Sequence, residues 1–219
     1  MTLDIKICGL TTDETLLAAL DEGASHIGFI FFSKSPRHIE PAAAGMLRKH
    51  ALGRAKAVAV TVNADDDALD AIVTQMAPDI MQLHGSETPE RVRAVKQHYG
   101  LPVMKAFSIS EATDLAQVGQ FSDVADRLLF DAKPPKDSQL PGGNGVSFDW
   151  RILAALDRNV DYMLSGGLNA ANIGDALRLS NPPGIDISSG VERAPGIKDA
   201  ALIAEFVKAV RSAQDTSAA

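Results

Sequence analysis

The chain has one cysteine, Cys8, which lies in the motif KICGLT two residues after Lys6. Residues two apart in an extended strand face the same side, so the Lys6 ammonium and the Cys8 sulfur would lie together. The thiolate is the basic form of cysteine, and a nearby ammonium lowers the pKa of a thiol. Cys8 is therefore a candidate general base, although a lone cysteine often serves only as a small buried apolar side chain.

A carboxylate, Asp131, ends the apolar segment LLFDAK. Strand alternation would place Asp131 and Leu129 on one face, with Leu128 and Phe130 on the other. Burial raises the pKa of a carboxyl group, which would let Asp131 hold a proton and act as a general acid. The alternative is that Asp131 only caps the turn that follows.

Two glycine-containing triplets occur late in the chain, SGG at residues 165–167 and SSG at residues 188–190. Glycines let backbone amides approach an anion closely, and loops in this part of an eight-unit barrel often bind phosphate. The candidate phosphate-binding residues are Gly166, Gly167, Ser189 and Gly190.

Other polar side chains are candidates for substrate binding. Arg37, in SPRH, could hold a carboxylate through two parallel hydrogen bonds, or it could be a solvated surface arginine. Asp186 could accept hydrogen bonds from a sugar hydroxyl or pair with a lysine, and His84, in QLHG, could contact a ligand or be structural. The sequence has no His-Glu-x-x-His or Cys-x-x-Cys spacing, so no metal site is predicted.

These candidates fall at or after the ends of short apolar segments that alternate with segments of helical spacing. The eight predicted strands cover residues 5–8, 26–31, 57–62, 80–83, 103–106, 128–131, 162–165 and 185–187. The predicted helices cover residues 12–22, 41–52, 66–76, 89–98, 111–118, 149–156, 171–179 and 198–211. This alternation predicts an α/β fold, a single (β/α)8 TIM barrel, in which the carboxyl ends of the strands face the active site.

An open doubly wound sheet is the main alternative, but a single glycine, Gly9, follows the first strand where a dinucleotide fold would have Gly-x-Gly-x-x-Gly. We expect one domain over residues 1–219, with a frayed tail from about residue 212. The segment 132–148 is rich in proline and glycine, which is typical of either a lid or a tolerated surface insertion.

The composition indicates a protein that acts on small molecules. The net charge is −7, with 28 acidic and 21 basic residues and no basic run, so nucleic-acid binding is not expected. No apolar run approaches the ~18 residues of a membrane span, and no signal sequence is evident. One cysteine fits a reducing compartment, so a cytoplasmic location is expected. Lys6 is also a candidate substrate-binding residue, and Lys6, Arg37 and backbone amides would supply the local positive field that an anionic substrate requires.

The motifs KICGLT, SPR, QLHG, FDAK, GGNGVSFDW, LSGGL, IDISSGVE and PGIKD occur in this order between residues 6 and 199. The ordered set resembles the phosphoribosylanthranilate isomerase family of tryptophan biosynthesis. The resemblance implies a (β/α)8 barrel that uses no cofactor or metal. We also expect a monomer or weak homodimer. The resemblance also implies an Amadori rearrangement of N-(5-phosphoribosyl)anthranilate to 1-(o-carboxyphenylamino)-1-deoxyribulose 5-phosphate.

The same resemblance implies a role for each matching position. Cys8 would be the general base and Asp131 the general acid, Arg37 would face the anthranilate carboxylate, and Asp186 would lie near the sugar hydroxyls. The phosphate loops would be those of Gly166, Gly167, Ser189 and Gly190. Asn144 and Ser165 depart from the family pattern, in which threonine and alanine are expected, and neither departure removes a catalytic group.

Two other functions share the late glycine loops. A ribulose-phosphate epimerase would need metal-binding histidines and aspartates on several strand ends, and only His84 and Asp131 look suitable. A barrel that binds a sugar phosphate without catalysis would be expected to lack the acid or the base, and both are present.

Overall fold

The chain folds into a closed barrel of eight parallel strands in the order β1 to β8. The computed structural model describes residues 3–135, 138, 140–157 and 160–218. The barrel strands are β1 (Asp4–Cys8), β2 (His26–Phe31), β3 (Lys56–Thr61), β4 (Ile80–Leu83), β5 (Val103–Ile109), β6 (Arg127–Ala132), β7 (Tyr162–Leu164) and β8 (Gly184–Ile187). Strand β1 pairs with both β2 and β8, so the sheet has no free edge and the predicted barrel, rather than an open sheet, is confirmed.

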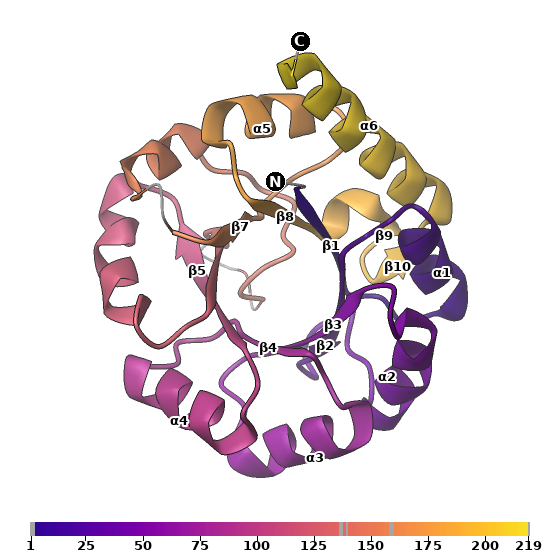
Figure 1. The fold of residues 1–219 in the computed structure, drawn as a ribbon, viewed down its shortest axis with the longest axis vertical. Helices are drawn as coiled ribbons and strands as arrows, with labels where there is room; N and C mark the ends of the chain where they lie inside the picture. Colours follow the sequence, from indigo (N-terminus) through magenta and orange to yellow (C-terminus); the bar gives the residue numbers. More distant parts are fainter. Residues whose placement is uncertain (1–2, 136–137, 139, 158–159, 219) are drawn as a thin grey trace.

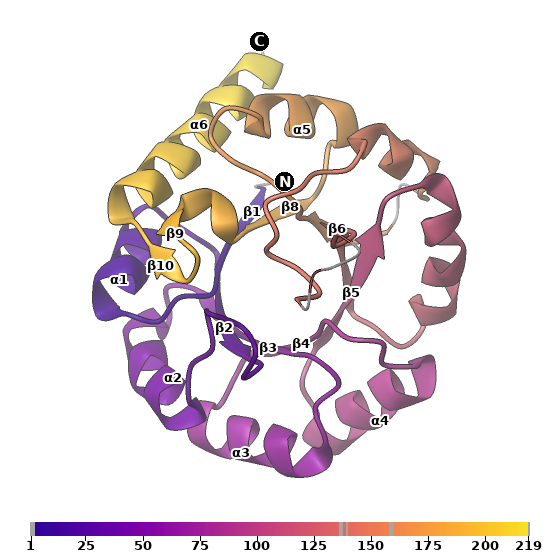
Figure 2. The ribbon, with the colours of Figure 1, turned by 180° about the vertical axis from the view of Figure 1, so that it is seen from behind.

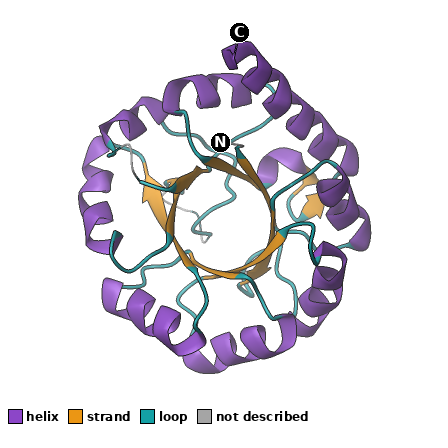
Figure 3. Cartoon of the chain, in the orientation of Figure 1, coloured by secondary structure: helices purple, strands orange, loops and turns teal. Residues whose placement is uncertain are grey.

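Helices surround the barrel as an outer ring (Figures 1 and 3). The α-helices are α1 (Asp13–Asp21), α2 (Pro41–Arg48), α3 (Asp66–Met76), α4 (Pro89–Tyr99), α5 (Ile173–Ser180) and α6 (Ala200–Ala218). The 3-10 helices in the described part of the chain are η1 (Lys49–Ala51), η2 (Ala112–Phe121), η3 (Trp150–Ala155) and η4 (Ser189–Val191). None of the described helices is long and apolar enough to cross a membrane.

The structure corrects several of the predicted helices. The segments predicted as helices over 111–118 and 149–156 form the 3-10 helices η2 and η3. In η2, Thr113, Asp114 and Gly119 have low α-helix propensity, and the Asp114 carboxylate accepts hydrogen bonds from the backbone at Ser110 and Glu111. Helix α6 continues through Ala218, past the frayed tail expected from residue 212, because no glycine or proline interrupts this segment.

Alternation along the strands separates an inner from an outer layer of side chains. Ile5 and Ile7 of β1, like Leu128 and Phe130 of β6, belong to the large apolar core that includes helix residues. A smaller apolar cluster fills the barrel and is formed by Cys8, Val58, Val60, Ile80, Met104, Ala106, Leu129 and Met163. The predicted inward orientation of Cys8 is therefore confirmed, and Cys8 lies at the end of the barrel where catalytic groups collect.

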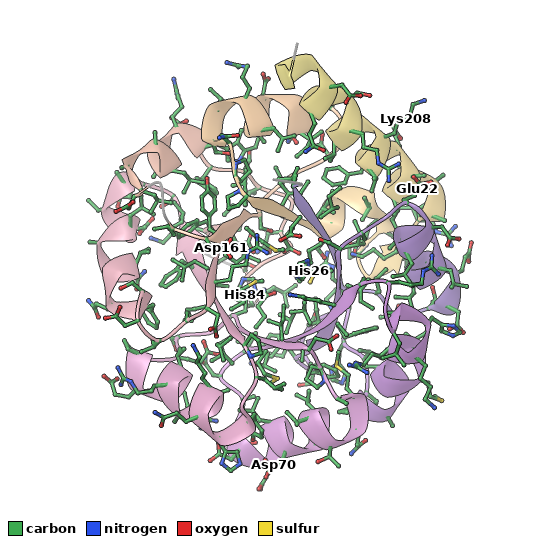
Figure 4. The ribbon with its side chains drawn as sticks, in the orientation of Figure 1. Glu22, His26, Asp70, His84, Asp161 and Lys208 are labelled. Carbon is green, nitrogen blue, oxygen red and sulfur yellow. The ribbon has the colours of Figure 1, made fainter. Side chains whose placement is uncertain are left out.

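A polar network occupies the amino ends of the strands, opposite the predicted site. Arg127 forms ion pairs with Asp4 (2.6 Å) and Asp161 (3.0 Å), and Ser25 Oγ lies 2.8 Å from His26 Nδ1. Burial lowers the pKa of His26 to about 4, although the Asp4 carboxylate opposes this shift. His26 is therefore neutral at physiological pH. Figure 4 draws it within the ring of strands.

Folding stability is expected to fall as the pH is lowered from about 6.5 to about 4 because of His26. The ordinary pKa of 6.5 applies in the unfolded chain, so between these pH values the unfolded state binds more protons and is favoured. Urea unfolding at pH 7 and pH 5 would measure the loss, which should be smaller in His26→Gln. The exposed His98 offers a matched control. Between pH 7 and pH 5, the free energy of unfolding of His98→Gln should fall by as much as that of the wild type. Equal losses in His26→Gln and the wild type would contradict this role for His26.

Candidate active site

A cavity opens at the carboxyl ends of the strands and collects most of the candidate residues. The candidates that line it are Cys8, Arg37, His84, Asp131, Gly166, Gly167, Asp186 and Ser189. Lys6 and Gly190 are not on its wall: Lys6 is fully buried beneath it, and Gly190 packs against the loop after β7. Residues from positions 8 to 189 thus meet at one end of the barrel, as expected for this fold.

Cys8 lies beside a buried ion pair. Lys6 Nζ donates a hydrogen bond to Asp186 Oδ1 (2.8 Å), and Ser165 Oγ donates to Asp186 Oδ2 (3.2 Å). Although burial disfavours the ammonium, the Asp186 carboxylate raises the pKa of Lys6, so Lys6 is charged. The lysine pairing considered for Asp186 is therefore present, and Ser165, one of the two departures from the family pattern, helps to hold this carboxylate.

The structure overturns the expectation that Lys6 leaves Cys8 with a lowered pKa. Burial raises the pKa of the Cys8 thiol, and the Asp186 carboxylate adds to the increase. Lys6 acts in the opposite direction but does not outweigh burial. In the free protein, the neutral thiol is therefore the main form of Cys8 near pH 7.

Gly28 leaves room for Cys8 and Lys6. A β-carbon at this position would lie 2.8 Å from Cys8 Sγ and 3.1 Å from Lys6 Nζ, so any side chain there would crowd both groups. The glycine that follows the cysteine is also required. Gly9 has a φ of +80°, and Arg37 Cδ would lie 2.9 Å from a β-carbon at this position. The Cys-Gly pair therefore lets Arg37 pack directly over the end of β1.

Asp131 is buried at the end of β6 and faces His84. Its Oδ1 accepts a hydrogen bond from the Ala132 backbone N–H (2.8 Å), and its Oδ2 lies 3.4 Å from His84 Nε2. Gln82 Nε2 lies 3.2 Å from His84 Nδ1. Gln82 also lines the cavity and was not identified from the sequence. Its signal was its place on β4, two residues before His84, which directly follows the strand.

Arg37 is buried and is not the solvated surface arginine considered as an alternative. Its Nε and Nη2 atoms donate to the two carboxylate oxygens of Glu192 at 2.7 and 2.8 Å. Glu192 begins β9 (Glu192–Ala194), which pairs with β10 (Ile197–Lys198) in a two-stranded sheet beside the barrel. Neither strand was predicted from the sequence, and Lys198 was expected in a helix, because these strands are only three and two residues long.

The described part of the long segment after β6 passes across the ring of strands (Figure 2), and its residues 140–144 and 146 line the cavity. A β-carbon at Gly142 would lie 2.3 Å from Asp131 Oδ2, and one at Gly143 would lie 2.6 Å from Arg37 Nη1. The Gly143 carbonyl accepts a hydrogen bond from Arg37 Nη2 (3.2 Å). These contacts favour a binding loop over a surface insertion for the described part of segment 132–148; residues 136, 137 and 139 lie outside the described part.

The other departure from the family pattern, Asn144, holds this loop together internally. Its Oδ1 accepts from Ser138 Oγ (2.7 Å), and its Nδ2 donates to the Leu140 carbonyl (3.2 Å). Asn144 also lines the cavity. It therefore contributes to the shape of the cavity lid.

The two glycine loops lie next to each other because they follow the neighbouring strands β7 and β8. Gly166 and Gly167 have φ values of +89° and +63°, which favour glycine. A β-carbon at Gly190 would lie 2.0 Å from the Leu168 carbonyl oxygen, so the loops pack backbone against backbone. Within the described residues, no group of three or more His, Cys, Asp or Glu side chains is arranged to hold a metal ion.

Comparison with known proteins gives matches over nearly the whole chain. A family model described as N-(5'phosphoribosyl)anthranilate (PRA) isomerase matches residues 5–209. A relative from Mesorhizobium japonicum, named N-(5'-phosphoribosyl)anthranilate isomerase, is 70% identical over 219 residues, which is 100% of both chains. A relative of the same name from Brucella canis is 67% identical over 213 residues, which is 97% of this chain and 96% of the relative.

Solved structures agree with these matches. The crystal structure of phosphoribosyl anthranilate isomerase from Thermotoga maritima has a TM-score of 0.86 and 32% identity, covering 96% of this chain and 100% of that one. A phosphoribosyl anthranilate isomerase in complex with reduced 1-(o-carboxyphenylamino)-1-deoxyribulose 5-phosphate has a TM-score of 0.83 and 31% identity, with the same coverage. Sequence and fold similarity therefore extend over the same residues.

Proposed function

This chain belongs to the N-(5'-phosphoribosyl)anthranilate isomerase family, and on this premise we propose that Cys8 and Asp131 are the general base and general acid of its reaction. The enzyme is an isomerase of tryptophan biosynthesis that converts N-(5-phosphoribosyl)anthranilate to 1-(o-carboxyphenylamino)-1-deoxyribulose 5-phosphate. The observation that carries the assignment is that Cys8 and Asp131, from β1 and β6, line one cavity. A thiol and a carboxyl group suit the base and the acid steps of an Amadori rearrangement.

The first step requires an acid. Asp131 donates its proton to the furanose ring oxygen while the ring opens to a Schiff base. His84 Nε2 faces the Asp131 carboxylate at 3.4 Å and stabilises the negative charge that remains after proton transfer. The Gln82 amide donates to His84 Nδ1, which keeps the ring proton on Nε2.

The second step requires a base. The Cys8 thiolate removes the proton from C2 of the sugar, which gives an enolamine that tautomerises to the ketone product. Lys6 favours the thiolate, and its own charge is maintained by Asp186. Because Asp186 also lines the cavity, it accepts hydrogen bonds from the sugar hydroxyls through the lone pairs that Lys6 and Ser165 leave free.

Binding of the two ends of the substrate fixes the sugar between the acid and the base. Arg37 holds the anthranilate carboxylate at the edge of its guanidinium that contacts the Gly143 carbonyl in the free protein. The Gly143 carbonyl must therefore move when the substrate binds. Backbone amides of the loops with Gly166, Gly167, Ser189 and Gly190 hold the phosphate. Orientation of this kind contributes several orders of magnitude to the rate of an intramolecular reaction.

We also propose a cytoplasmic enzyme that is a monomer or a weak homodimer. The single cysteine supports a reducing compartment. Among the described residues, the large exposed apolar side chains are Leu17, Met46, Leu52 and Ile197. Four side chains are few for the apolar centre of a large obligate interface.

The activity is tested by mixing the purified protein with phosphoribosylanthranilate formed in situ and following anthranilate fluorescence. We expect rapid loss of fluorescence that depends on protein concentration and is absent from the buffer control. A folded protein that produces no loss would indicate a barrel that binds a sugar phosphate without catalysing this reaction.

A further inference from the structure

The residues behind Arg37 form a buried charged cluster that does not line the cavity. Glu192 contacts the Nε–Nη2 edge of the Arg37 guanidinium through two hydrogen bonds, and both side chains are less than 5% exposed. Two parallel hydrogen bonds fix the plane of a guanidinium as well as its position. The edge formed by Nη1 and Nη2 is left facing Gly143 and the cavity.

Lys198 supplies the second positive charge of the cluster. Its Nζ donates to Glu192 Oε1 (2.5 Å) and to the Ser188 carbonyl (2.9 Å). Ser188 Oγ in turn donates to the Cys8 carbonyl (3.1 Å). Burial would raise the pKa of Glu192, but hydrogen bonds from Arg37 and charge from Lys198 lower it, so Glu192 is ionised.

We propose that Glu192 is a positioning residue that orients Arg37 for the substrate carboxylate, with Lys198 holding Glu192 in place. This inference rests on the proposed role of Arg37. A buried arginine without a partner would either turn toward another acceptor or lie in several rotamers, so the cavity-facing edge would no longer be preorganised. The same cluster connects Arg37 to Ser188 and to the end of β1, so the carboxylate site and the base are held by one set of contacts.

A double-mutant cycle on Arg37 and Glu192 tests this inference. Arg37→Ala is expected to raise KM by roughly 10- to 100-fold, because it removes a charge-assisted bidentate contact with the substrate carboxylate. Glu192→Gln is expected to raise KM by about tenfold with little change in kcat, since the carboxyl-to-amide change weakens the hold on Arg37. If Glu192 acts through Arg37, the double variant has the KM of Arg37→Ala alone.

The exposed Glu205 on α6 provides a matched control, because Glu205→Gln makes the same chemical change without affecting the cavity and should leave KM unchanged. Near-ultraviolet circular dichroism checks that each variant is folded. If Glu192→Gln does not fold, the pair Glu192→Gln with Lys198→Met removes both buried charges together and is used in the same cycle.

Two results would overturn the inference in distinguishable ways. If the effects of Arg37→Ala and Glu192→Gln multiply in the double variant, Glu192 acts independently of Arg37 and is not its positioning residue. If Arg37→Ala leaves KM unchanged, the carboxylate is bound elsewhere, and the proposed role of Arg37 fails together with that of Glu192.

Discussion

Cys8→Ser is expected to lower kcat by about a thousandfold, within the range for loss of a general base. Serine has nearly the shape of cysteine, but its hydroxyl is far less acidic, so it cannot supply an anionic base near neutral pH. Stopped-flow fluorescence at saturating substrate would measure kcat. KM is expected to stay within a few fold of wild type, because Arg37 and the phosphate loops are untouched.

The pH dependence of the wild type checks the same role. Since burial raises the pKa of Cys8, the thiolate is the minor form near neutrality, and the rate of proton removal from C2, the step that follows ring opening by Asp131, should rise with pH above 7 as the thiol ionises. Cys8→Ser should lack this rise. A variant with near-wild-type kcat would leave Cys8 as a buried packing residue, and a rise that persists in the variant would assign the ionisation to another group.

Asp131→Asn is expected to lower kcat by about 10²- to 10⁴-fold, because an amide has no acidic proton for the ring oxygen. The amide oxygen can still accept the hydrogen bond that Asp131 Oδ1 now receives from the Ala132 N–H (2.8 Å), so the end of β6 should keep its shape. Steady-state fluorescence assays would give kcat, and thermal unfolding would show whether the variant is folded.

The exposed Asp70 on α3, which Figure 4 shows at the outer edge of the helical ring, is a suitable control position. Asp70→Asn makes the same chemical change far from the cavity and should retain wild-type turnover. If Asp131→Asn also retains it, Asp131 is not the acid that opens the ring.

Strand positions and strand faces were predictable from the sequence because they depend on local alternation. The predicted strands 26–31 and 80–83 coincide with β2 and β4, and the inward orientation of Cys8 and Asp131 follows from their apolar neighbours at Ile7 and Phe130. The family could also be predicted from the sequence, because each motif is a short contiguous stretch and the order of the motifs can be read along the chain.

Three features depended on the closed barrel. Glu192 meets Arg37 across 155 residues, and no local pattern marks such a pair. The direction of the Cys8 pKa shift depends on how completely the thiol is buried and on the charges of Lys6 and Asp186. Lys6 Nζ lies 2.8 Å from Asp186 Oδ1 only because β1 pairs with β8. The contacts of Gly142 and Gly143 with Asp131 and Arg37 require the loop after β6 to lie over the cavity.

The sequence by itself therefore determined which residues could take part in chemistry and on which face of each strand they lie, because side-chain alternation is a property of neighbouring residues. The tertiary structure alone decided their partners and their charge states. Burial and electrostatic interactions depend on distances through space, and these distances are set only when β1 and β8 close the barrel.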